Sequence, residues 1–144
     1  MPVSQAELLK EDFAMTLFTK KQTGDAGEDY AVRYLKKQGC KILERNYRKK
    51  YGEIDIIARE KDCLLFVEVK TRHINSLTEP YQAVTYSKRR KIIMTSEAYL
   101  SERKENAYCR FDVCEVFVDE KTLKLDRIRY IKNAFTTENN RARR

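Results

Sequence analysis

The hydrophobic and polar positions of this 144-residue chain follow a helical period in some segments and a strand period in others. Residues 23–40 predict a helix, because their apolar positions recur three and four residues apart. Asp25 is a candidate N-cap for this helix, and Gly39 suits the left-handed residue that ends one. The apolar stripe consists of Ala31, Val32 and Leu35.

Strand-like patterns follow this helix. Three predicted strands, which we expect to form an antiparallel meander, cover about 41–48, 52–58 and 63–71. A second helix and two further strands then complete the pattern, over about 87–101, 108–118 and 123–131. Cys109 and Cys114 fall within the first of these later strands, and we expect both in the core.

The length and composition fit one compact domain with two extensions. We expect a helical arm over 1–22, a folded domain over 23–135 and a disordered basic tail over 136–144. No window approaches the roughly 18 to 20 consecutive apolar residues of a membrane span. The N-terminus also lacks the apolar centre of a secretory signal, so we expect a cytoplasmic protein with no membrane partner.

Two neighbouring strands carry charged residues where apolar ones would be expected. Side chains alternate across a strand, so Glu53 and Asp55 share one face of the first, and Glu68 and Lys70 share one face of the second. An even number of residues in the turn, for instance four, would set Asp55 opposite Phe66. Asp55 and Glu68 would then be diagonal neighbours about 7 to 8 Å apart at Cα.

Clustered carboxylates repel one another on a half-buried sheet unless a cation neutralises them. Mg²⁺ takes oxygen ligands and keeps waters, one of which can attack a phosphodiester. Lys70 could orient that water, bind the phosphate or transfer a proton. The alternative is a surface ion pair between Glu68 and Lys70, which is common on exposed strands. The apolar run around Glu68 and the position of Glu28 on the core side of the first helix favour the catalytic interpretation.

The chain is strongly basic, with a formal net charge of +8. Such a charge favours a polyanionic partner, above all nucleic acid, through release of counterions from phosphates. The candidate nucleic-acid-binding residues are Arg48, Lys49, Lys50, Arg72, Lys88, Arg89 and Arg90. The group from Lys88 to Arg90 begins the second helix, where Ser87 and free backbone amides could hold phosphate; a solvated helix face explains it equally well.

Six segments together resemble a known family. They are GEDYAVRYL, RNYRKKYGEIDIIA, LLFVEVKTR, EPYQAV, CRFDVCEV and IKNAF, and they occur in order over about residues 23–135. This pattern resembles the YraN-like family of uncharacterised bacterial proteins. That family is assigned to the restriction-endonuclease-like superfamily of PD-(D/E)xK nucleases, near the archaeal Holliday-junction resolvases.

The resemblance implies an α/β, restriction-endonuclease-like core with a central mixed sheet flanked by helices. It also implies that Glu28 is the acidic residue on the helix, Asp55 and Glu68 the metal-binding carboxylates, the Val69 carbonyl a further ligand and Lys70 the catalytic lysine. Ile54 precedes Asp55, so the literal Pro-Asp is absent. Arg89 follows Lys88 where relatives often have glutamine, which leaves that position without its expected role.

The leading hypothesis is a Mg²⁺- or Mn²⁺-dependent endonuclease acting on DNA. No base-reading motif is visible, so we expect selectivity for branched or otherwise structured DNA over selectivity for sequence. A symmetric junction would suit a homodimer. RNA stays open as a substrate. The alternative is a non-catalytic nucleic-acid-binding module on a nuclease fold, acting as a partner in a DNA- or RNA-processing complex.

Overall fold

The computed structural model describes residues 17–75 and 84–137. Its seven elements are α2 (Lys20–Lys37), β1 (Lys41–Lys49), β2 (Gly52–Glu60), β3 (Cys63–His73), α3 (Tyr86–Arg103), β4 (Tyr108–Val118) and β5 (Leu125–Phe135). Most of the predicted arm (1–22) and of the predicted tail (136–144) lies outside the described residues. The order αβββαββ is the predicted one, and the strands end within a few residues of their predicted bounds.

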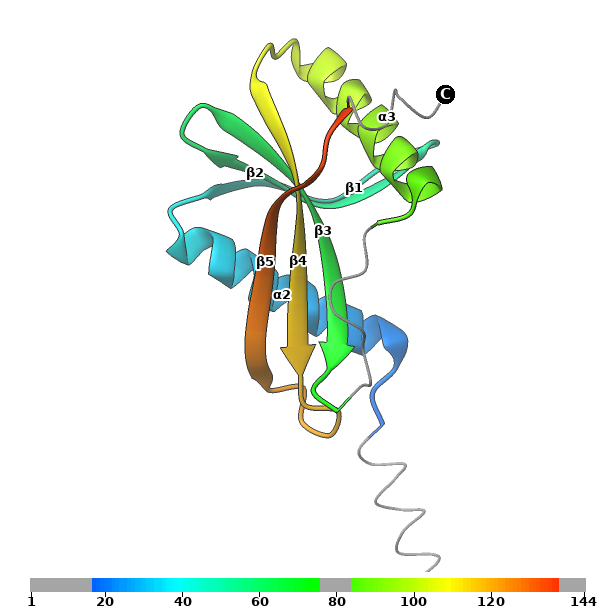
Figure 1. The fold of residues 1–144 in the computed structure, drawn as a ribbon, viewed down its shortest axis with the longest axis vertical. Helices are drawn as coiled ribbons and strands as arrows, with labels where there is room; N and C mark the ends of the chain where they lie inside the picture. The colour runs from blue at the N-terminus through cyan, green and yellow to red at the C-terminus, as the bar shows by residue number, and fades with distance from the viewer. Residues whose placement is uncertain (1–16, 76–83, 138–144) are drawn as a thin grey trace, which may run out of the picture.

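The strands form one five-stranded mixed sheet in the order β1-β2-β3-β4-β5. Strands β1, β2 and β3 pair antiparallel, which confirms the predicted meander. Strand β4 runs parallel to β3, and β5 returns antiparallel to β4 (Figure 1). A parallel neighbour requires a crossover, and α3 provides it. The fold is therefore α/β, as predicted.

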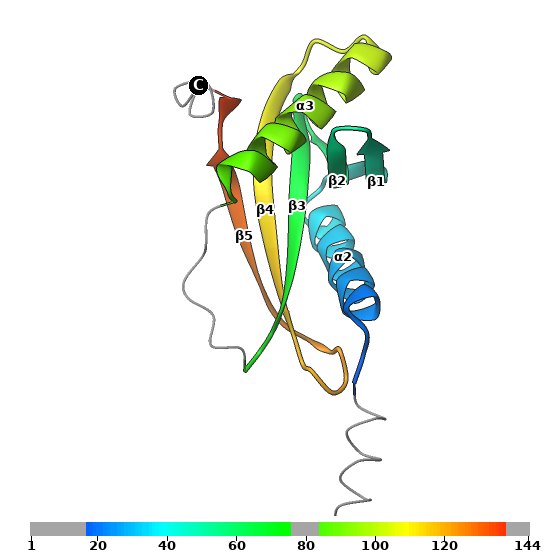
Figure 2. The ribbon, with the colours of Figure 1, turned by 90° about the vertical axis from the view of Figure 1, so that its right-hand side faces the viewer.

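The two helices cover opposite faces of the sheet (Figure 2). Helix α2 packs with alternate residues of β3 and β4 in one apolar cluster, and α3 packs with the intervening residues in a second; in β2, Ile56 and Ala58 belong to the first cluster, and Ile54 and Ile57 belong to the second. The central strand β3 is therefore apolar at every position from Leu64 to Val67, all buried. Such a continuous apolar run is what a strand needs when both of its faces are covered.

Helix α2 begins earlier than predicted. Thr19 is its N-cap: the Thr19 hydroxyl accepts from the Gln22 amide at 3.0 Å, and the Gln22 side chain accepts from the Thr19 amide at 2.9 Å. The predicted cap Asp25 instead lies within the helix and binds Lys21 at 3.0 Å. This reciprocal capping box satisfies two amides at once, which a lone aspartate further along cannot do. The prediction for Gly39 is confirmed, since its φ is +88°.

A close contact fixes α2 against β3. A Cβ added at Gly27 would lie 1.8 Å from the Thr71 hydroxyl oxygen, so only glycine allows the helix to approach this closely. Glu28 is the next residue and is 7% exposed. The contact therefore carries the acidic side chain of α2 to the C-terminal half of β3.

The turn between β2 and β3 consists of two residues, Lys61 and Asp62, and not of the four that the sequence analysis took as an example. The pair Glu60–Cys63 closes the hairpin, and Lys61 in the turn takes a left-handed φ of +53°. Arg59 and Glu60 consequently continue the strand. The predicted pairing of Asp55 with Phe66 is wrong, because Phe66 pairs with Ile57.

Two smaller findings complete the fold. The prediction that Cys109 lies in the core is wrong: Cys109 is exposed near the start of β4, whereas Cys114 is buried further along the same strand. The reason is that β4 begins beyond the cover of the helices, where its first residue Tyr108 is 82% exposed. Neither of the described helices is long and apolar enough to cross a membrane.

Candidate functional site

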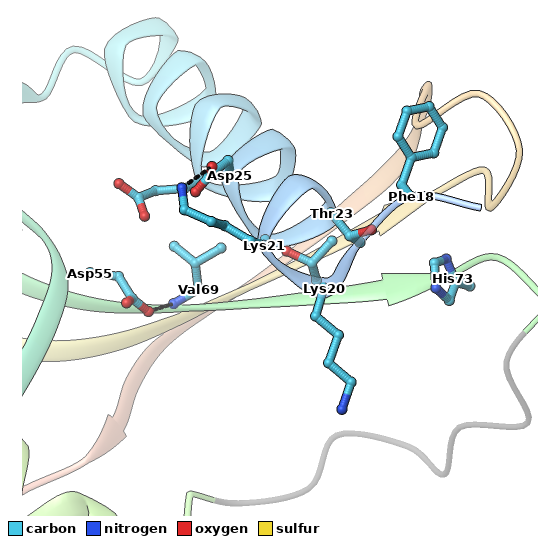
Figure 3. Close-up of a pocket in the computed structure, with 11 residues that line it drawn as sticks. Phe18, Lys20, Lys21, Thr23, Asp25, Asp55, Val69 and His73 are labelled. Carbon is cyan, nitrogen blue, oxygen red and sulfur yellow. Dashed lines mark hydrogen bonds and ion pairs between the residues drawn. The ribbon is translucent and has the colours of Figure 1, made fainter. Parts of the chain in front are cut away.

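The candidate site lies where β2 separates from β3. The last backbone pair between them joins Ile56 to Val67, so Asp55 and Glu68 are the first residues beyond the paired segment. The Val69 amide donates to Asp55 Oδ2 at 2.8 Å (Figure 3). A side-chain carboxylate thus accepts the hydrogen bond that a neighbouring strand would otherwise accept. The register differs by two residues from the predicted one, and the charge of Glu68 acts on Asp55 across the end of the hairpin.

The electrostatics of Asp55 are unfavourable for a charged group. Burial, followed by the negative charge of Glu68, raises the pKa of Asp55 from its usual 3.8 to about 7, although the hydrogen bond from the Val69 amide opposes the shift. Glu68 itself is 7% exposed. Two acidic groups, Glu68 buried and Asp55 half-buried, are therefore held together with too little positive charge around Asp55.

Lys88 is the partner of Glu68. Its ammonium group, on the first turn of α3, forms an ion pair with Glu68 Oε1. Burial opposes the charge of Lys88, but the hydrogen bond and charge of Glu68 outweigh burial and raise its pKa. Burial also lowers the pKa of Lys70, and the positive charge of Lys88 lowers it further. The site thus contains two carboxylates and two lysines, and the pKa of Lys88 is raised whereas that of Lys70 is lowered.

Glu28 approaches Asp55 from α2 and is anchored by β1. Its Oε1 accepts from Arg45 Nε at 2.9 Å and from Asn46 Nδ2 at 3.0 Å. Asn46 adopts a left-handed φ of +52°, a conformation that asparagine tolerates better than most residues. Glu28 is therefore already neutralised, although its charge still contributes to the raised pKa of Asp55.

A cavity of about 460 Å³ opens between the start of α2 and the end of β3 (Figure 3). Its lining includes the buried Glu28 and the half-buried Asp55 and Val69, together with the exposed side chains of Lys20 and Lys21. Glu68 and Lys70 do not line it, because alternation along β3 directs them to the α3 side of the sheet. Asp55 stands at the strand edge between these two groups.

The residues present fit a hard divalent cation. Asp55 and Glu68 supply carboxylate oxygens, the donors that Mg²⁺ and Mn²⁺ prefer, and the raised pKa of Asp55 shows that added positive charge would be favourable there. Within residues 17–75 and 84–137, no three His, Cys, Asp or Glu side chains group closely enough to hold an ion. A bound ion would thus depend on two carboxylates, the Val69 carbonyl and water, as Mg²⁺ sites often do.

The predicted nucleic-acid-binding residues fall into three places. Lys88 belongs to the site itself, and Arg72 lies on the same sheet face as Lys70, with its Nε 2.8 Å from Glu115. The other two groups are Arg48, Lys49 and Lys50 at the β1–β2 turn, and Arg89 and Arg90 on the first turns of α3.

The residues at the β1–β2 turn are engaged with neighbours. Arg48 pairs with Glu53 at 3.2 Å, Lys49 pairs with Glu102, and the Lys50 ammonium lies 5.1 Å from the centre of the Tyr51 ring. At the start of α3 the cap is Thr85 and not Ser87; the Thr85 hydroxyl accepts from the Lys88 amide at 3.3 Å. The predicted phosphate site at Ser87 therefore has a different local geometry from the one expected.

Sequence reasoning missed the roles of three residues of the site. Arg45 and Asn46 begin the segment RNYRKKYGEIDIIA, but only the packing of β1 against α2 shows that they hold Glu28. Lys88 was identified as a basic residue, but nothing in its sequence neighbourhood indicates that it contacts Glu68, twenty positions earlier.

Comparisons with known proteins agree on one family. The model of a family described as "Uncharacterised protein family UPF0102" matches residues 27–116, which include both carboxylates and both lysines of the site. A UPF0102 protein of Caldicellulosiruptor saccharolyticus is 45% identical over 117 residues, covering 81% of this chain and 98% of the relative. One from Clostridioides difficile is 47% identical over 116 residues, covering 80% and 97%. The chain belongs to the UPF0102 family.

Proposed function

We propose that this protein is a divalent-metal-dependent endonuclease that hydrolyses phosphodiester bonds of DNA, with a preference for branched or structured substrates. One observation carries the proposal: Asp55 and Glu68 adjoin the end of the paired segment of β2 and β3, with Glu68 buried, Asp55 half-buried and the pKa of Asp55 raised to about 7. Two carboxylates that repel each other on a sheet lower its stability. Carboxyl groups with perturbed pKa values beside lysines in a cleft are typical of active sites. The resemblance to PD-(D/E)xK nucleases supports the same function.

The chain's own residues can be assigned roles from their positions. Asp55, Glu68 and the Val69 carbonyl would hold Mg²⁺ or Mn²⁺, which when bound activates water and stabilises negative charge on phosphoryl oxygens. Burial lowers the pKa of Lys70, which makes its amine a better candidate than an ordinary lysine to orient the attacking water and take part in proton transfer. Lys88 retains its charge and can bind a phosphate oxygen.

Glu28 and the basic surface complete the proposal. Glu28 borders the same cavity as Asp55 and is held by Arg45 and Asn46, so it can orient water in the cavity. The net charge of +8 supports a nucleic-acid substrate. A homodimer would match a junction with two symmetric strands, and RNA is the alternative substrate.

One observation favours a second candidate, a nucleic-acid-binding module without cleavage activity. The ion pair between Lys88 and Glu68 already neutralises one carboxylate from within the chain. A protein that never binds metal could retain this pair for structure alone. The two candidates differ in what a divalent cation does to the protein and to the nucleic acid.

Cleavage of end-labelled four-way-junction, flap, single-stranded and linear duplex DNA, with Mg²⁺ or Mn²⁺, separates them. Asp55→Ala, Glu68→Ala and Lys70→Ala should each abolish cutting while largely keeping DNA binding. Glu53→Ala is the matched control, because Glu53 is an acidic residue on the same strand that pairs with Arg48. Cutting by the control and not by the site variants supports the nuclease. Binding by all proteins without cutting by the wild type favours the module.

A further inference from the structure

Basic side chains gather on the part of the sheet that α3 leaves uncovered. In Figure 2, α3 lies across one end of β3, β4 and β5, and the other end of these strands extends beyond it. The strand register arranges the side chains of this face in rows that cross all three strands. One row is Lys70, Glu115 and Arg129, and the next is Arg72, Phe117 and Arg127.

Glu115 organises the first of these rows. Its side chain is 2% exposed and lies between two arginines: Oε2 accepts from Arg72 Nε at 2.8 Å, and Oε1 is 3.3 Å from Arg129 Nε. One buried carboxylate thus fixes two guanidinium groups on one sheet face. A guanidinium held at Nε by a carboxylate is already oriented, so part of the entropy cost of ordering it for a phosphate is met within the protein.

Arg127 is held differently in the second row. Its guanidinium carbon lies 3.9 Å from the centre of the Phe117 ring, and Asp126 accepts a hydrogen bond from it at 2.8 Å. Its side chain is 57% exposed and that of Arg129 is 45% exposed. The face therefore presents cations to solvent in fixed positions, with Glu115 as the only acidic member of the two rows.

These rows lead directly to the candidate site. Lys70 in the first row is two residues from Glu68, and successive rows on one face are about 6.6 Å apart along a strand. Such a surface carries cations but no group arranged to read base edges, so it suits the sequence-independent phosphate backbone. An acidic protein surface would match the charge but would not explain why the rows start at a site for phosphodiester chemistry.

We infer that Arg72, Arg127 and Arg129, together with Lys70, bind the phosphate backbone of a nucleic-acid strand and guide it to Asp55 and Glu68. The inference rests on the proposed function, because it takes nucleic acid as the ligand. Arg127 and Arg129 are its new members, and neither belongs to the proposed catalytic machinery.

The test measures binding of labelled single-stranded and duplex DNA and RNA by fluorescence anisotropy in EDTA, over a range of salt concentrations. The double variant Arg127→Ala/Arg129→Ala should bind more weakly. The slope of log K against log salt should become shallower by about 1.4 for single strands and about 1.8 for duplexes if both arginines contact phosphates. Arg127→Lys/Arg129→Lys should restore most of the slope.

The matched control removes two cations from the opposite side of the molecule, by Arg33→Ala/Lys37→Ala on the exposed surface of α2. Thermal melting verifies that each variant is folded. Equal losses in the two double variants would attribute the effect to net charge and overturn the inference, as would no loss in either. If either result overturns the inference but the wild type still cuts nucleic acid, the proposed function is retained without this binding surface. A wild type that neither binds nor cuts would overturn both.

Discussion

Replacing Asp55 by asparagine should stabilise the metal-free protein at alkaline pH. The folded wild type retains the Asp55 proton up to about pH 7, whereas the unfolded chain releases it near 3.8. The folded state therefore binds more protons within this window, and the free energy of unfolding falls as the pH rises from about 4 to about 7. Above that window the folded protein contains an ionised, buried carboxylate.

The size of the effect follows from the shift in pKa. A change from 3.8 to about 7 is about three units, and one unit corresponds to about 1.36 kcal/mol, so the ionised carboxylate costs the fold about 4 kcal/mol. Asparagine has nearly the same shape and can still accept from the Val69 amide, but it carries no charge. Asp55→Asn should therefore recover up to about 4 kcal/mol at about pH 8 and almost nothing at about pH 4.

Urea unfolding of both proteins at these two pH values, with and without Mg²⁺, measures the difference. Mg²⁺ should stabilise the wild type by mass action and leave Asp55→Asn almost unchanged. Asp112→Asn is the matched control: Asp112 is fully buried but binds Arg110 at 2.9 Å and Tyr130 at 2.6 Å. Its replacement removes the nearer carboxylate from Arg110, whose other acidic partner, Glu60, is 3.8 Å away, and should cost about 3–5 kcal/mol. A comparable loss in Asp55→Asn at alkaline pH would refute the reasoning.

Two further substitutions address the lysine pair and the helix contact. Lys88→Met removes the internal cation from Glu68, so the metal-free protein should become less stable. Its affinity for Mn²⁺, measured by titration calorimetry, should rise, because the ion no longer competes with Lys88 for Glu68. Unchanged affinity would mean that Lys88 and the ion do not compete. Gly27→Ala places a methyl group against Thr71 and should cost about 1–3 kcal/mol in urea unfolding. Gly24→Ala, with nothing within 4 Å, should be neutral or stabilise by up to about 1 kcal/mol, and equal effects at both glycines would contradict the proposed contact.

The elements of the fold could be predicted because their periodicity is local. The run from Leu64 to Val67 identifies a strand covered on both faces, and alternation around it places Glu68 and Lys70 together. The register could not be fixed in this way, because it depends on a turn in which Lys61 adopts a left-handed φ that lysine seldom takes.

The candidate site was predictable along the two paired strands and at Glu28 on α2. Asp55 and Glu68 are recognisable from their interruption of apolar runs, since buried charge is expensive. The contact between Lys88 and Glu68 depends on how α3 crosses the sheet, which no local pattern encodes. Arg129 lies still further along the chain, and only the pairing of β4 with β5 brings it to Glu115.

The central claim is that Asp55 and Glu68 bind a divalent cation. Titration of Mn²⁺ into the metal-free protein, followed by electron paramagnetic resonance at about pH 8, tests it most directly. We expect one ion per chain in the wild type and in Glu53→Gln, with binding lost or severely weakened in Asp55→Asn and in Glu68→Gln. Equal binding by all four proteins, or no binding by the wild type at millimolar Mn²⁺, would contradict the account.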